Sequence, residues 1–208
     1  MVEQFDDVGI ERVLRWATIE LGTADLSDSL GPGVIAPAPP SHVYPSGAAV
    51  AGKVVLFRRR RPEEAEEAPS SFDVLFRNVV AGSIALVHCT PDIGAAFGSN
   101  LALQAAACRA QAILTDGTCR DSRLLQQVGI PVGSNGTVPT RPTGCRMTPT
   151  DTEDMFGVTW RVGDWLLRDA DGVLRLDSEL AQRTAGELAE SAGAELEALL
   201  SSVSTRRR

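Results

Sequence analysis

The chain has 208 residues and a formal net charge of −7 at neutral pH. Its hydrophobic content of 43% and charged content of 23% are ordinary for a globular protein, and its length suffices for one domain with a proper core or two small ones. The acidic balance argues against a general nucleic-acid-binding protein, because neutralising phosphates requires a basic face. No apolar run is long enough to span a bilayer, so we expect no membrane partner.

The numbers and spacing of cysteine and histidine residues limit the kinds of disulfide and metal site that this chain can form. The four cysteines form no CxxC pair, and the N-terminus has no secretory signal pattern, so we expect reduced thiols and a cytoplasmic protein. Only two histidines are present, which disfavours a histidine-rich zinc site. Any metal would be held mainly by oxygen, and Mg²⁺ or Mn²⁺ suits such ligands.

The N-terminal third is predicted to be helical at first and then irregular. Apolar residues at helical spacing predict a helix over 10–21, and we expect Thr23 to be the N-cap of a short second helix. The proline- and glycine-rich stretch 31–47 predicts an extended surface loop. Residues 48–57 predict a strand pair or one bulged strand. The basic and acidic blocks of 58–68 predict a solvated loop or helix start.

The central part of the chain alternates between short apolar runs and helical segments. Helices are predicted over 72–80, 100–109 and 122–128, and strands over 83–88, 112–115 and 130–132. From residue 83 onward this is a βαβαβ unit, which implies a parallel sheet with right-handed crossovers. Two polar loops, 94–100 and 116–121, fall at the carboxyl edge of that sheet, where ligands gather in such folds.

The C-terminal part is predicted to contain a long loop, strands and a final helix. Residues 133–154 are polar and turn-rich and predict a loop. Strands are predicted over 157–164, 165–169 and 173–176, the last entered through a hairpin turn. The helix over 178–202 has leucines on one face and is weakened by Gly186 and Gly193. That face is expected to cover the sheet or to pack against another chain.

Five stretches together resemble one protein family. In chain order they are TADLSDSLG, GSNLA, TDGTCRD, IPV and GVTWRVGDWLLRDADGVL, spread from Thr23 to Leu176. They resemble the family that joins 4-hydroxy-4-methyl-2-oxoglutarate aldolases with the regulator of ribonuclease E activity A. The resemblance implies an RraA-like α/β sandwich with the central βαβαβ unit, C-terminal β-hairpins and a terminal helix. We expect one domain over 1–208, with its core at about 23–176 and its terminal helix at about 178–202.

The resemblance also implies an assembly and an activity. Members form homotrimers, or trimers paired into hexamers, with active sites between subunits. The catalytic branch uses a divalent metal to cleave small 2-oxo acids, by retro-aldol release of pyruvate or by decarboxylation of oxaloacetate. Both reactions pass through an enolate, which a divalent cation stabilises.

Site residues follow from matching this sequence to the family motif. Arg120 matches the substrate-binding arginine, and an arginine can grip a carboxylate bidentately. Asp121 matches the metal ligand for Mg²⁺ or Mn²⁺. The start of the helix would hold a substrate carboxylate on its free backbone amides, and Ser99 or Asn100 is expected to cap that helix. The residues expected in contact with substrate there are Gly98, Asn100, Leu101 and Ala102.

Ser99 is the departure from the catalytic pattern. Catalytic members carry an acidic residue twenty intervening residues before the arginine, and this chain has Ser99 there. The change removes a negative charge beside the proposed metal and a possible proton-transfer group. The regulator branch typically lacks the aspartate after the arginine, whereas Asp121 is present here.

Two functions therefore stay open. The first is a lyase-type enzyme acting on a small 2-oxo acid, with Arg120, Asp121 and Ser99 in the catalytic site. The second is a non-catalytic protein-binding regulator of the ribonuclease E inhibitor type, or a member repurposed for metal-independent biosynthetic chemistry.

Simpler interpretations accompany several of these residues. Arg120 and Asp121 alone are compatible with a surface ion pair in which Asp121 caps the next helix. Cys119 is expected to be a packed thiol and His88 a hydrogen-bonded structural histidine, with acid–base catalysis as its minority role. On the terminal helix, Glu195 and Glu197 are candidates to approach a neighbouring subunit's metal.

Overall fold

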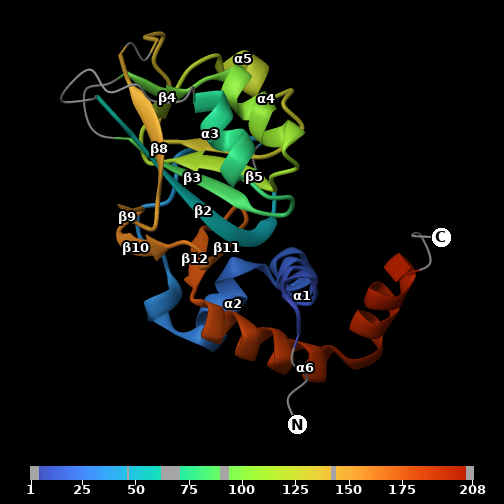
Figure 1. The fold of residues 1–208 in the computed structure, drawn as a ribbon. Coiled ribbons are helices and arrows are strands. Elements are labelled where there is room, and N and C mark those ends of the chain that lie inside the picture. The colour runs from blue at the N-terminus through green and yellow to red at the C-terminus, as the bar shows by residue number, and fades with distance from the viewer. Residues whose placement is uncertain (1–4, 46, 62–70, 90–93, 142–143, 205–208) are drawn as a thin grey trace.

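The computed structural model describes residues 5–45, 47–61, 71–89, 94–141 and 144–204, and beyond Gly193 it describes the backbone alone (Figure 1). The helices are α1 (Asp7–Glu20), α2 (Gly22–Leu30), the 3-10 turn η1 (Pro32–Val34), α3 (Ser71–Asn78), α4 (Ser99–Ala107), α5 (Ser122–Leu125) and α6 (Ser178–Ser204). The strands are β1 (His42–Tyr44), β2 (Val50–Arg60), β3 (Ile84–Cys89), β4 (Ala95–Phe97), β5 (Ala112–Thr115), β6 (Thr118–Cys119), β7 (Val132–Ser134), β8 (Arg146–Thr150), β9 (Thr152–Met155), β10 (Val158–Arg161), β11 (Trp165–Arg168) and β12 (Val173–Leu176).

One large sheet organises the molecule, with the strand order β1-β7-β5-β3-β2-β11-β12 and β8 paired with β2. Strands β2, β3, β5 and β7 run parallel, and the other pairings in this sheet are antiparallel. Helices α4 and α5 connect β3, β5 and β7, so the predicted βαβαβ unit is confirmed.

The sheet is covered on both faces. Alternate residues of β3 point to opposite sides: Ala85 and Val87 pack in the cluster under α3 and α4, whereas Ile84 and Leu86 pack in a second cluster with Trp160 of β10. Burial on both faces explains why this strand is an unbroken apolar run in the sequence. A third cluster joins α1 and α6 to β11 and β12, at the lower end of the molecule in Figure 1.

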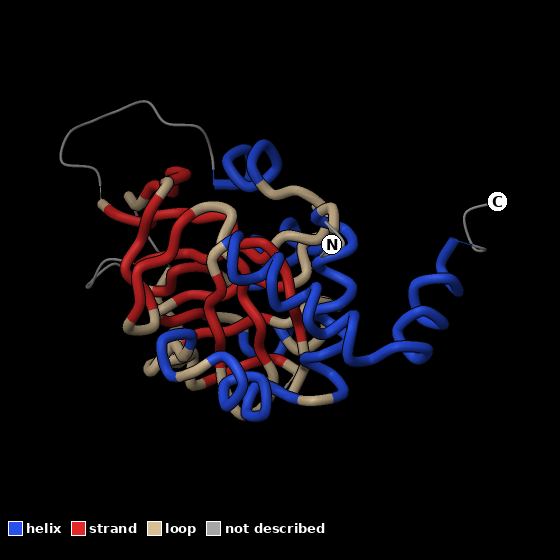
Figure 2. The backbone as a smooth tube through the Cα atoms, turned by 90° about the horizontal axis from the view of Figure 1, so that it is seen from below, coloured by secondary structure: helices blue, strands red, loops and turns tan. Residues whose placement is uncertain are grey.

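The first part of the terminal helix packs against its own chain. Leu180 and Leu188 lie against the cluster that contains α1, so this part of the predicted apolar face covers the chain's own sheet. The helical backbone is interrupted at Gly193 (φ 49°, ψ −126°), whereas Gly186 stays helical. Figure 2 shows the segment after Gly193 extending away from the rest of the fold. In the part of the chain that the structure describes, no helix combines the length and apolarity of a bilayer span.

Loop predictions were wrong in several segments where strands form through distant pairing, including 31–47, which contains β1 paired with β7. Residues 133–154 were expected to be a loop but include β8 and β9, and β8 pairs with the far half of β2. Its sequence RMTPT has little apolar alternation, so backbone pairing rather than side-chain burial sustains it. The loops 94–100 and 116–121 contain β4 and β6, which pair with each other.

The prediction for the basic run was also wrong. Residues 58–60 continue β2 as one strand, and their side chains alternate between its faces. Arg58 bonds Glu153 through both carboxylate oxygens, at 2.8–3.2 Å, and Arg59 on the other face is only 7% exposed. The acidic remainder of that prediction, 62–68, lies outside the described residues.

The expectation that Thr23 caps the second helix was wrong as well, because α2 begins at Gly22. The Thr23 amide and hydroxyl instead donate to the carboxylate of Asp169, at 2.6 and 2.5 Å. Asp169 also accepts the amides of Asp171 and Gly172 in the β11–β12 turn. Burial alone would raise the pKa of Asp169, but these hydrogen bonds outweigh it and lower that pKa. One carboxylate thus fastens α2 to the hairpin.

A neighbouring aspartate has a similar structural role. Asp164, which is 5% exposed, accepts the Arg161 amide at 2.8 Å and the Arg175 Nε at 2.7 Å. It therefore closes the turn between β10 and β11 and ties that turn to β12. The GD and D-x-DG elements of the sequence hold the fold together.

We expect Asp169→Ala to lower the free energy of unfolding by about 2–4 kcal/mol, since several hydrogen bonds to a charged acceptor are lost together. Urea denaturation measures this loss. Asp171→Ala is the matched control in the same turn, because the Asp171 side chain is exposed. Equal stability of the two variants would contradict the fastening role of Asp169.

Candidate functional site

A pocket of about 260 Å³ lies where β4, α4 and α3 meet the loop after β6. It is lined by Arg59, Ser71, Phe72, Phe97, Gly98, Asn100, Leu101, Arg120, Asp121 and Arg141. Of the seven residues predicted for the site, the structure places Gly98, Asn100, Leu101, Arg120 and Asp121 in this wall. Ser99 lies just behind it at 5% exposure, and Ala102 is fully buried.

Close backbone packing brings the two polar loops together. Strands β4 and β6 pair in parallel, and the Arg120 amide donates to the Phe97 carbonyl at 3.0 Å. Gly98 then passes so near the second loop that an added Cβ would lie 2.4 Å from Asp121 Oδ2 and 2.9 Å from Arg120 Cγ. Only glycine fits at this crossing, so the GSN and CRD stretches depend on each other.

Asp121 anchors the start of α4. Its Oδ2 accepts hydrogen bonds from the Ser99 amide at 3.1 Å and the Ser99 hydroxyl at 3.2 Å, and Arg120 Nε lies 3.5 Å from the same oxygen. The N-cap position of α4 is Gly98, so the prediction that Ser99 or Asn100 caps this helix was wrong. Asp121 occupies the N-cap position of α5 in a left-handed conformation, but its side chain makes no capping bond there.

Not every backbone amide at the start of α4 is available to donate a hydrogen bond to a ligand. The Ala102 amide donates to the Gly98 carbonyl at 3.2 Å, so it is engaged within the helix. Among the described residues no backbone carbonyl accepts a hydrogen bond from the Asn100 or Leu101 amide. Both residues line the pocket beside Arg120, and free amides at a helix N-terminus bind anions.

The charged side chains in the described part of the pocket wall are mostly positive. Three guanidinium groups, from Arg59, Arg120 and Arg141, share the wall with one carboxylate, Asp121. Arg59 extends from the helix-covered face of β2, with its Nη1 3.5 Å from the Ser71 hydroxyl. Burial lowers the pKa of Arg59 from its ordinary value. The site is therefore built for an anion.

The fit of a resident Mg²⁺ or Mn²⁺ can be judged from the oxygen ligands. Across the described residues, no group of three or more histidine, cysteine, aspartate or glutamate side chains is placed to hold a metal. Asp121 is the one carboxylate in the described lining, and its Oδ2 is already engaged by Ser99. Magnesium is octahedral and usually keeps several waters, so one or two protein carboxylates commonly bind it. The described lining of one chain offers a single carboxylate, Asp121, beside three guanidinium groups that oppose a cation, and the side chains of Glu195 and Glu197 lie outside the described residues.

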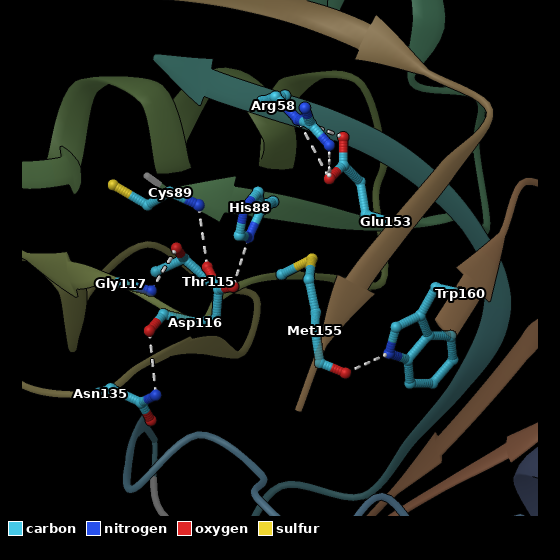
Figure 3. Close-up of polar contacts among 10 residues, drawn as sticks. All are labelled: Arg58, His88, Cys89, Thr115, Asp116, Gly117, Asn135, Glu153, Met155 and Trp160. Atoms are coloured by element: carbon cyan, nitrogen blue, oxygen red, sulfur yellow. Dashed lines mark hydrogen bonds and ion pairs between the residues drawn. The ribbon is translucent and has the colours of Figure 1, made fainter. Parts of the chain in front are cut away.

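His88 and Cys119 take the structural roles expected of them. His88 Nδ1 lies 2.5 Å from Asp116 Oδ2, and Asp116 Oδ1 accepts the Cys89 amide at 2.9 Å (Figure 3). His88 shares its sheet face with Arg58 and Glu153, opposite the face that Arg59 occupies. Cys119 is fully buried with its Sγ 3.1 Å from the Ser134 hydroxyl, and burial raises its pKa.

The His88–Asp116 pair predicts a pH-dependent stability. The hydrogen bond between His88 and the Asp116 carboxylate raises the pKa of His88 above its ordinary value of 6.5 and outweighs burial, which lowers that pKa. The charge of Glu153 also raises the pKa of His88, and the charge of Arg58 lowers it. Protonated His88 therefore stabilises the fold fully below pH 6.5, and this contribution disappears as pH rises through the higher folded-state pKa.

We expect His88→Gln to remove about 1–2 kcal/mol of unfolding free energy below pH 6.5 and progressively less at higher pH, because one charge-assisted hydrogen bond is lost. Urea denaturation across this pH range tests it. His42→Gln, at an exposed histidine, is the control. A loss that is the same at every pH would contradict the assignment.

Sequence reasoning missed Arg59, Arg141 and Phe72 as lining residues. For Arg59 a signal was present: Val55, Phe57 and Arg59 follow a period of two along β2, and Phe57 packs under the helices. Continuing that alternation would have placed Arg59 on the pocket side. Arg141 comes from the segment before β8, which nothing in the local sequence connects to the site.

Comparison with known proteins decides the family. The RraA-like profile, described as Aldolase/RraA, matches residues 23–175, which covers both loops of the pocket. The chain belongs to the RraA-like family. Comparison with curated proteins finds no match.

Solved structures agree with membership of the RraA-like family. RraAS2 from Streptomyces coelicolor, described as an unusual member of the RNase ES inhibitor RraA family, aligns with a TM-score of 0.71 and 20% identity over 96% of this chain and 99% of that one. The RNA-processing inhibitor RraA from Thermus thermophilis aligns with a TM-score of 0.59 and 26% identity over 74% and 91%. An uncharacterized protein from Pseudomonas syringae pv. tomato aligns with a TM-score of 0.68 and 19% identity over 99% and 94%. The predicted RraA-like fold is thus confirmed.

The RraA-like family includes both aldolases and ribonuclease E inhibitors. Membership therefore establishes the scaffold without choosing between enzyme and regulator. The distinction between enzyme and regulator therefore has to be argued from the residues of the pocket.

Proposed function

We propose that this RraA-like protein is a lyase-type enzyme that binds a small 2-oxo acid in the pocket and cleaves the carbon–carbon bond between C3 and C4, one bond removed from the oxo carbon. The single observation that carries the proposal is the position of Arg120 beside the open Asn100 and Leu101 amides. Together these donors suit a carboxylate and the oxygen anion that forms next to it.

The residues supply binding, charge stabilisation and a proton acceptor. The α4 amides and Arg120 hold the 1-carboxylate and the 2-oxo oxygen of the substrate. In a decarboxylation the bond to the departing carboxyl breaks, CO₂ leaves, and the electron pair moves to the enolate oxygen, where Arg120 donates hydrogen bonds. A proton from water then returns to carbon and gives the product oxo acid. Asp121 is the acid–base group in the described lining, and it is within reach of such a water.

A coupled assay for pyruvate tests the proposal. Purified protein in its native assembly is offered oxaloacetate and 4-hydroxy-2-oxo acids, both in chelator and with added Mg²⁺ or Mn²⁺. We expect protein-dependent pyruvate release that oxalate, an analogue of the pyruvate enolate, inhibits competitively. If the folded protein releases pyruvate from none of these acids, the lyase proposal fails.

Self-association belongs to the same proposal. RraA family proteins are oligomeric, and a trimer or hexamer is the assembly that we propose. Phe72, Phe76 and Val80 form a stripe at four-residue spacing along and just beyond α3, and they are 44%, 70% and 63% exposed. Phe72 also lines the pocket, so a subunit seated on this stripe would border the site.

We expect Phe76→Glu to reduce the molar mass measured by light scattering from that of the oligomer to that of the monomer, because a charge would be buried in the contact. Ile19→Glu, at a similarly exposed apolar residue of α1, is the control and should leave the mass unchanged. An unchanged mass for Phe76→Glu would remove α3 from the interface.

A second candidate is a protein-binding regulator of the ribonuclease E inhibitor type. The same exposed α3 stripe favours it, since exposed aromatic side chains are frequent anchors of protein contacts. In a ribonuclease E cleavage assay, inhibition that survives Arg120→Gln but is lost with Phe76→Glu would support the regulator. Such a result, together with absent pyruvate release, would replace the lyase proposal.

A further inference from the structure

Three arginine side chains in the pocket wall are positioned to bind an anionic ligand. The three guanidinium groups come from separate elements: Arg59 from β2, Arg120 from the loop after β6, and Arg141 from the segment before β8. They line the same pocket as the start of α4, whose Asn100 and Leu101 amides carry further partial positive charge. A space of about 260 Å³ is large enough for a small organic acid.

The one carboxylate in the described lining is already engaged. Asp121 Oδ2 receives both donors of Ser99 and faces Arg120, so this oxygen is engaged in the packing of the two loops and only the other oxygen remains for chemistry in the pocket. The acidic residue that would stand beside it in the catalytic branch is Ser99 here, a neutral donor. Among the described residues, a divalent cation entering this space would meet three like charges and a single opposite one.

Arg59 is the most informative of the three. It is 7% exposed, and the period of β2 turns it toward the pocket while its neighbour Arg58 pairs with Glu153 on the other face. On the pocket side its Nη1 lies 3.5 Å from the Ser71 hydroxyl. A guanidinium that folding has already removed from water loses little further hydration when an anion arrives, which strengthens their hydrogen bonds.

We infer that this pocket binds its anionic ligand through the guanidinium groups of Arg59, Arg120 and Arg141, and that binding requires no divalent cation. This inference rests on the proposed 2-oxo acid site and specifies how the anion is held. In the lyase reaction the same guanidinium groups donate hydrogen bonds to the enolate oxygen, in the role that a metal has in metal-dependent lyases.

Calorimetric titration of the native assembly with oxalate tests the inference independently of turnover. Oxalate is added in chelator and, separately, with excess Mg²⁺ or Mn²⁺. We expect the dissociation constant in chelator to lie within about twofold of that with metal, since hydrogen-bonded arginines and not a cation hold the anion. Titration with Mn²⁺ alone should give no tight binding.

Single substitutions test which of the arginines bind the anion. Arg59→Gln and Arg141→Gln should each weaken oxalate binding in chelator about tenfold, because a charge-assisted hydrogen bond is lost. Arg60→Gln is the matched control: it neighbours Arg59 on β2 but is absent from the pocket wall. Arg141 is exposed, so its variant tests the inference even if loss of the buried Arg59 impairs folding.

Binding of oxalate only in the presence of Mg²⁺ or Mn²⁺, or unchanged binding by both variants, would overturn the inference. Metal-free binding that depends on the arginines, without pyruvate release from any 2-oxo acid, would uphold it and refute the lyase proposal alone. The two ideas are therefore separable in one set of experiments.

Discussion

Arg120→Gln is expected to lower kcat/KM for pyruvate-releasing cleavage by roughly 10²–10³-fold, the usual loss when one donor to a developing oxyanion is removed. Arg120 lines the same pocket as Asn100, Leu101 and Asp121, so in the proposed mechanism its removal takes away both substrate binding and enolate stabilisation. Arg120→Lys keeps the charge but loses the planar fork, and it should chiefly raise KM.

Arg123→Gln is the control for this pair of variants. Arg123 is exposed on α5, three residues further along the same segment, and takes no part in the pocket wall. Its activity should match that of the wild type. Wild-type kcat/KM in Arg120→Gln, measured on a substrate that the protein turns over, would remove Arg120 from the mechanism.

Ser99→Asp is expected to create metal affinity where the wild-type pocket has little. A carboxylate at this position would lie beside Asp121, reduce the positive excess of the pocket and supply a missing oxygen ligand. A negative charge at the first turn of α4 also suits the helix dipole, so the fold should tolerate it. We expect Mn²⁺ to bind about 10–100-fold more tightly, and pyruvate release from oxaloacetate to become stimulated by Mn²⁺.

Ser99→Asn separates charge from size in this experiment. Asparagine resembles aspartate in shape but adds no charge, so Mn²⁺ affinity should remain at the wild-type level. Calorimetry measures the metal, and circular dichroism confirms that both variants are folded. If a folded Ser99→Asp variant binds Mn²⁺ no better than Ser99→Asn, the pocket has diverged from the metal-dependent pattern by more than this residue.

The sequence predicted the parts of the fold that local patterns control. The apolar runs of β3 and β5 and the helical stripe of α1 were found because burial sets their periodicity. Strand β8 was missed because its pairing partner lies far away in the sequence and its own residues are mostly polar. Long-range backbone pairing leaves little trace in a short polar segment.

For the site, the family motif led to Arg120, Asp121 and the start of α4, and the structure brings all three together. The capping relation was reversed: Asp121 holds Ser99, whereas Ser99 was expected to cap its own helix. Arg141 was beyond reach of sequence reasoning, because only the folded chain carries that segment to the pocket.

The fastening of α2 by Asp169 bears on how far the family's fingerprint can inform about chemistry. Two of its most recognisable stretches meet at that carboxylate, and the second of them also contains Asp164, which holds Arg175. These residues stabilise the architecture and take no part in the pocket wall, so a change in the pocket, such as serine at position 99, leaves the fingerprint intact. Enzymes and inhibitors can consequently share one recognisable sequence pattern. A substrate assigned from this pattern alone rests on residues that determine the fold, not on residues that bind the substrate.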